Sequence, residues 1–228
     1  MRKVVSIFLL TASMAVAEVP TKRLNDAAAA LSEVMSARDK GIPMSLLARA
    51  ECIVIVPGLK SGAFGVGAKY GKGFFSCRKA GDWSAPAAIR VEGGSFGFQI
   101  GLLETDLILL VMNRKGADRL LTDQFTLGGA GEVAAGPVGR TTTAQTDISL
   151  RAEMLSWSRA RGVFAGLSLT GATLRQDIGD NNEIYGQPLR NKQVIYGDVA
   201  WPETAGELHS VLNKYAARAR QRRRHQSR

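Results

Sequence analysis

The stretch from residue 83 to residue 101 constrains the fold more than any other part of this 228-residue chain. Its second half alternates apolar and small residues and carries glycine at positions 93, 94, 97 and 101. Glycine at this density inside a strand pattern marks bends, bulges or places where another backbone approaches closely. The next run, residues 102–113, is almost wholly apolar after Asp106. We therefore expect sharply bent strands here.

Short strand-like runs recur along the chain and predict an antiparallel sheet or partial barrel. The runs are residues 52–56, 63–70, 73–78, 87–92, 95–103, 107–112, 125–136, 148–158 and 163–174. Pro57-Gly58 is expected to end the first strand, Gly71-Lys72 to form a hairpin turn, and Glu104 and Asp106 to lie at an exposed turn. Helical spacing predicts helices at residues 22–40, 44–50, 114–121, 178–185 and 204–219, and residues 194–195 read as a weak remnant. The predicted class is α+β: a bent, glycine-rich antiparallel sheet flanked by N-terminal and C-terminal helices.

The helix predicted at residues 22–40 is amphipathic. Leu24 and Leu31 lie on its apolar stripe, and Lys22 and Arg23 mark its basic start. One interpretation is an ordinary helix packed on a core. The other is a helix that lies on a membrane surface with basic flanks.

The first 17 residues have the pattern of a secretory signal peptide: a basic start, an apolar run and a small-x-small cleavage site. A membrane anchor or a buried helix is the alternative. Export predicts a periplasmic or envelope protein, with one domain at residues 18–217 and a basic tail at residues 218–228. The formal net charge of +10 falls to +2 without Arg2, Lys3 and the six arginines of the tail. For an exported chain the tail favours anionic headgroups over nucleic acid, unless it is only a solvated helix end.

Cys52 and Cys77 are the two cysteines of the chain, and both lie in predicted strands. An oxidising compartment favours a disulfide between them, provided that the two strands are near neighbours. Two buried free thiols remain the alternative.

A second basic region lies in the predicted hairpin, at Lys60, Lys69 and Lys72. Phe74 and Phe75 follow, and we expect them to be exposed beside the lysines. Strand alternation must place some of these side chains on one face. The region could meet lipid headgroups, or it could be an ordinary solvated sheet face.

Three incomplete patterns suggest other functions: a serine esterase, a nucleotide site and a calcium site. Ser95 stands in a G-x-S-x-G sequence, so a serine esterase with Asp198 and His209 is a remote alternative, although a strand follows Ser95 where the pattern needs a helix. The glycines around Lys72 do not complete a phosphate-binding loop, so no nucleotide is expected. Acidic and amide side chains at residues 177–183 lack the spacing of an EF-hand, and a helix cap explains them as well as calcium does.

Several segments in order resemble the SYLF domain, also called the Ysc84 actin-binding domain family. They are residues 83–86, 93–101, 125–128, 134–140, 158–169 and 185–186. The resemblance covers most of the chain after residue 22. Within the family, the chain is similar to secreted bacterial members, which carry cysteines at positions like Cys52 and Cys77. It implies phospholipid binding without catalytic residues or cofactors, assisted by the N-terminal helix.

The sequence therefore predicts non-enzymatic binding of anionic phospholipid at an envelope membrane. The expected lipid contacts are Lys22, Arg23, Leu24, Leu31, Lys60, Lys69 and Lys72. Actin binding, known in the fungal branch of the family, is not expected after export. The alternative is an envelope structural or protein-interaction module that does not depend on lipid.

Overall fold

The structure, a computed structural model, describes residues 19–37, 41–64, 66–79, 82–96, 101–128, 132–136, 152–160, 163–164 and 169–226. The predicted signal peptide lies outside these residues. The helices are α1 (Pro20–Ser36), α2 (Met44–Arg49), α3 (Arg114–Leu120), α5 (Ile178–Tyr185), α6 (Asn191–Tyr196) and α7 (Gly206–Gln226), with a 3₁₀ turn at Glu203–Ala205. No helix in the described ranges has the length and apolar character needed to cross a membrane.

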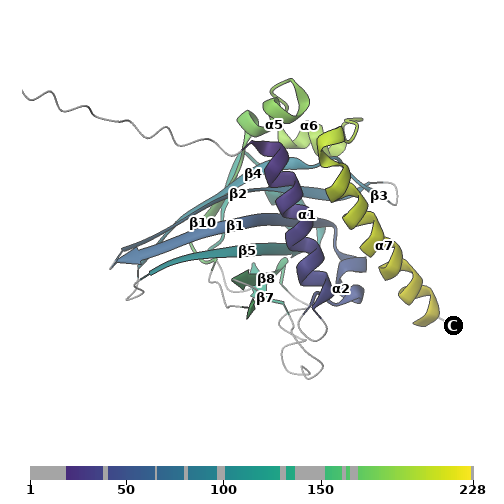
Figure 1. The fold of residues 1–228 in the computed structure, drawn as a ribbon, viewed down its shortest axis with the longest axis horizontal. Coiled ribbons are helices and arrows are strands. Elements are labelled where there is room, and N and C mark those ends of the chain that lie inside the picture. Colours follow the sequence, from purple (N-terminus) through teal and green to yellow (C-terminus); the bar gives the residue numbers. More distant parts are fainter. Residues whose placement is uncertain are drawn as a thin grey trace, which may run out of the picture.

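The sheet curls into a half-barrel with helices from both ends of the chain on one face (Figure 1). Its strands are β1 (Cys52–Phe64), β2 (Val66–Lys79), β3 (Asp82–Trp83), β4 (Ala87–Phe96), β5 (Gly101–Val111), β6 (Gln124–Thr126), β7 (Val133–Ala135), β8 (Met154–Ala160), β9 (Val163–Phe164) and β10 (Ala172–Gln176). They are ordered β6-β10-β4-β2-β1-β5-β8-β7, with β3 on β2 and β9 on β8. Among the strands that the structure describes, the pairing of β7 with β8 is parallel and the others are antiparallel. The predicted α+β class is confirmed.

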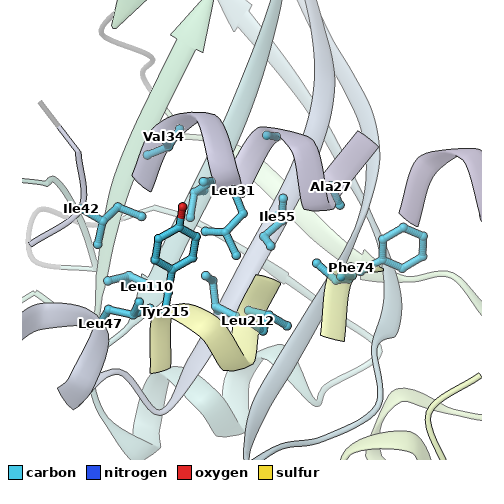
Figure 2. Close-up of a cluster of buried hydrophobic side chains, with 14 of the residues drawn as sticks. Ala27, Leu31, Val34, Ile42, Leu47, Ile55, Phe74, Leu110, Leu212 and Tyr215 are labelled. Atoms are coloured by element: carbon cyan, nitrogen blue, oxygen red, sulfur yellow. The ribbon is translucent and has the colours of Figure 1, made fainter. Parts of the chain in front are cut away.

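One layer of the core lies between the sheet and the helices α1, α2 and α7. Leu24, Leu31 and Val34 recur at helical spacing on α1 and are fully buried. They pack toward alternate sheet residues such as Ile55, while Tyr215 of α7 closes the layer from the side (Figure 2). The amphipathic helix predicted near the N-terminus is therefore a core helix in this structure.

A second layer lies on the opposite face of the same strands. Cys52, Val54 and Val56 point into it, because successive residues of a strand face opposite sides. Cys52 faces Cys77 directly across the β1–β2 pair, and the two form a disulfide with an S–S distance of 2.02 Å. The predicted disulfide is confirmed.

The prediction that Pro57-Gly58 ends the first strand is wrong. β1 continues to Phe64, and the register with β5 shifts between Val56 and Leu59. Gly58 adopts a positive φ of 58°, and its amide donates a hydrogen bond to the Asp106 carboxylate at 2.9 Å. The Pro-Gly pair is thus a bulge, which bends the strand and does not stop it.

The hairpin turn predicted at Gly71-Lys72 is also wrong, because β2 runs unbroken through both residues. Gly73 is needed for close packing: a Cβ there would lie 2.2 Å from the Ile55 carbonyl oxygen. The break predicted after residue 92 is absent too, since β4 extends to Phe96, and β5 runs through Glu104 and Asp106. Gly71 and Gly73 allow β1 to pack closely against β2, and a local turn pattern cannot reveal such a contact.

The C-terminal half differs from the prediction in four places. The run 125–136 is divided between β6 and β7 on opposite edges of the sheet, and the run 163–174 between β9 and β10. Residues 194–195 belong to the helix α6. α7 continues as a helix to Gln226, through most of the predicted tail.

Candidate functional site

Two of the predicted lipid contacts lie in a buried ion-pair cluster. Arg23 of α1 pairs with Asp180 of α5, and both side chains are almost fully buried. The Lys72 Nζ atom lies 2.8 Å from a carboxylate oxygen of Asp180 and 2.9 Å from one of Asp177. Two cations thus face two carboxylates, which joins the start of α1 to α5 and to β2.

The electrostatics of the cluster favour the charged forms of Asp177 and Lys72. Burial acts to raise the pKa of Asp177, but the Lys72 ammonium, the Asp180 amide and the Arg90 charge together outweigh it and lower that pKa below its usual value. Burial likewise acts to lower the pKa of Lys72, and hydrogen bonds to Asp180 and Asp177 outweigh it and raise that pKa. Asp177 also caps α5 by accepting a hydrogen bond from the Asp180 amide. The cap explanation holds for these acidic residues, and among the described residues no cluster of His, Cys, Asp or Glu could hold a metal.

The remaining α1 residues predicted as lipid contacts also make contacts within the protein. Leu24 and Leu31 are fully buried beneath the helix. Lys22 is exposed and pairs with Asp26 one turn along α1, at 2.8 Å. Insertion of the apolar face of α1 into a bilayer would first require the helix to leave the sheet.

Lys60 and Lys69, by contrast, lie near the Phe64/Val66 end of the β1–β2 pair. Figure 1 shows the ends of β1, β2 and β5 projecting beyond the helices on the left. Lys60 is exposed, and it stands across from Tyr70 on β2 and from Glu104 on β5. Lys69 stands across from Ser61 and is half-buried, which lowers its pKa from the usual value. The predicted exposed aromatics Phe74 and Phe75 are not part of this region, because both are buried in the core.

Three large apolar side chains are exposed at the same strand ends: Leu102 at 82%, Tyr70 at 49% and Leu103 at 41%. They are three of the five exposed large apolar residues in the described part of the chain. Consecutive residues of a strand point to opposite faces, so the exposure of both leucines means that neither face of β5 is covered here. We call Lys60, Lys69, Tyr70, Leu102 and Leu103 the strand-end surface.

The strand-end surface combines apolar groups with ammonium groups, which is the chemistry that meets a headgroup layer. Register places Lys60, Tyr70 and Leu102 on the face that carries α1, and Lys69 and Leu103 on the other. Single exposed leucines need no explanation, but several apolar side chains near one projecting edge make it a candidate interaction site. The sequence prediction missed both leucines. Their signal is an apolar pair at the end of the predicted strand 95–103, directly before Glu104.

The esterase residues are not brought together. Asp198 forms an ion pair with Lys79 at the end of β2. The His209 Nε2 atom lies 3.7 Å from a carboxylate oxygen of Asp82, and Asp82 of β3 stands across from Lys79 in the sheet. Ser95 pairs with Gly67 near the start of β2. The strand between Gly67 and Lys79 is about 40 Å long at ordinary rise, so Ser95 lies far from the other two.

Comparison with known families matches residues 92–215 to Ysc84, described as "Las17-binding protein actin regulator". The SH3 domain-containing YSC84-like protein 1 of Rattus norvegicus is 34% identical over 179 residues, which are 78% of this chain and 52% of the relative. Protein YSC84 of Saccharomyces cerevisiae is 33% identical over 183 residues, 78% of this chain and 39% of the relative. The chain therefore spans about half or less of these relatives. The family match includes Leu102 and Leu103, whereas Lys60 and Lys69 precede it.

Proposed function

The chain belongs to the Ysc84 family, and we propose that it is a non-enzymatic phospholipid-binding protein that docks on membranes through its strand-end surface. The observation that carries this proposal is the exposure of Leu102 and Leu103 on opposite faces of one projecting strand, with Lys60 and Lys69 beside them. Residues 1–17 support a place at the cell envelope, after export and cleavage of that segment.

The expected energies are those of a peripheral, reversible binder. Moving the exposed parts of the two leucines out of water is worth about 2–3 kcal/mol. Each lysine near an anionic surface adds about 1 kcal/mol, and salt screens that part. Strand ends with no covering helix can enter the headgroup layer without any unfolding, whereas α1 cannot.

The test is sedimentation of the purified full chain with vesicles. We expect binding to vesicles of phosphatidylcholine with phosphatidylglycerol, and weaker binding to phosphatidylcholine alone. The Leu102→Ser, Leu103→Ser double variant is expected to bind at least about tenfold more weakly. Tyr196→Ser is the matched control, because Tyr196 is 44% exposed on α6, away from the strand ends.

The proposal fails if the double variant and the control bind vesicles as the unchanged protein does. The melting temperature of each variant shows whether it is folded. Failure of the unchanged protein to sediment with any vesicle would favour the second candidate, a protein-interaction module. The family description, which names a Las17-binding actin regulator, is the observation that favours this second candidate.

A further inference from the structure

We infer that the protein bridges two anionic membranes, one held at the strand-end surface and a second held by the C-terminal part of α7. The inference rests on the proposed function for the first contact. The second contact comes from a different part of the chain, and the strand-end surface does not require it.

The composition of α7 changes sharply along its length. Leu212, Tyr215 and Ala216 are buried in the core layer and hold the first part of the helix on the body of the protein, and Ala219 is buried as well. Figure 2 shows Leu212 and Tyr215 in this layer. Residues 220–226 contain no apolar residue, yet the helix continues through them to Gln226. A helical segment without an apolar stripe is not held by packing against a core.

The charge of this segment specifies the chemistry of its partner. No aspartate or glutamate follows Glu207, and arginine occupies positions 218, 220, 222, 223 and 224. Such a segment attracts a polyanion, and near an anionic bilayer each arginine strengthens binding about fivefold. With no apolar group to insert, this contact depends on charge alone and weakens steeply with salt.

The positions of the two surfaces decide between one membrane and two. Figure 1 places the strand ends and the C-terminal end of α7 at opposite ends of the molecule, pointing away from each other. α7 packs against α1 and α2, so the helix direction is set by the core. The part of the helix beyond Ala219 is about 10 Å long. A flat bilayer that receives the strand ends therefore leaves the C-terminal end of α7 directed toward a second surface.

The test is clustering of phosphatidylcholine–phosphatidylglycerol vesicles by the full chain, followed by light scattering, with sedimentation measured in parallel. We expect the unchanged protein to cluster vesicles at low salt. The Arg222→Gln, Arg223→Gln, Arg224→Gln variant should still sediment with vesicles but lose at least about tenfold in clustering. The matched control removes three exposed charges elsewhere, as Arg114→Gln, Arg190→Gln, Lys192→Gln, and should cluster normally.

Each contrary outcome has a distinct meaning. Sedimentation without clustering by the unchanged protein overturns bridging and leaves the proposed function intact. No sedimentation overturns both. Clustering that survives the triple arginine change would mean that two bound copies pair with each other, and it overturns the role of α7. Tighter binding of α7 arginines to duplex DNA than to vesicles, lost in the same variant, overturns the assignment of a bilayer as the second partner.

Discussion

The cluster at the start of α1 and the strand-end surface both contain basic residues, but the two sets of basic residues lie in opposite environments. Arg23 and Lys72 face two carboxylates inside the protein, whereas Lys60 lies exposed beside Tyr70 and Leu102. The first pair of cations is neutralised within the fold and holds α1 in place. A cation can serve a membrane only where its side chain stays exposed to solvent, as that of Lys60 does.

The largest expected effect is a loss of stability when the buried cluster loses one of its cations. Arg23→Met leaves the buried carboxylates of Asp177 and Asp180 with one cation, so the free energy of unfolding should fall by about 3–5 kcal/mol. Lys22→Met removes the same charge from the adjacent, exposed position and should cost about 0.5 kcal/mol or less. Urea unfolding of both variants measures the difference. Equal, small losses would mean that the cluster contributes no net stability.

A smaller effect is expected at the end of the β1–β2 pair opposite the strand ends. Reduction of the Cys52–Cys77 disulfide, which closes a loop with a sequence separation of 25, should lower the free energy of unfolding by about 3 kcal/mol. Vesicle binding at a temperature where the reduced protein is folded should not change. A parallel loss of binding would show that the strand ends depend on this distant link.

The smallest expected effect is a loss of vesicle affinity when the strand-end surface loses its two lysines. Lys60→Gln with Lys69→Gln should weaken binding to anionic vesicles about 10- to 30-fold at low salt, and much less at high salt. Lys22→Gln with Lys214→Gln removes the same charge from exposed positions away from the strand ends and should leave affinity nearly unchanged. Similar losses in the two double variants would mean that overall charge, and not the strand-end surface, controls binding.

Much of the fold follows from local pattern. The spacing of Leu24, Leu31 and their neighbours predicts α1 to within a few residues, and the same holds for α3 and α5. The paired cysteines predict a link between neighbouring strands, which the structure contains. These features depend on residues close in sequence or on a pairing with few alternatives.

The errors share one cause, which is that contacts distant in sequence override local preference. Gly71 suggests a turn by its identity, yet it is small because the Val56 and Leu59 side chains lie against it. Phe75 stands beside lysines in the sequence and packs into the core in the structure. Of the candidate site, the basic positions Lys60 and Lys69 were predictable, while Leu102 and Leu103 have the same apolar character as buried β5 residues.

The amino-acid sequence by itself determined the family, the α+β class, the amphipathic first helix and the cystine. Only the tertiary structure decided which basic residues are available to a partner. The physical reason is that the counter-charge of Arg23 stands 157 positions away, at Asp180, and no periodicity of a single segment records such a pair. Availability also required the ends of β1, β2 and β5 to extend past their covering helices, which depends on how the layers are assembled (Figure 1).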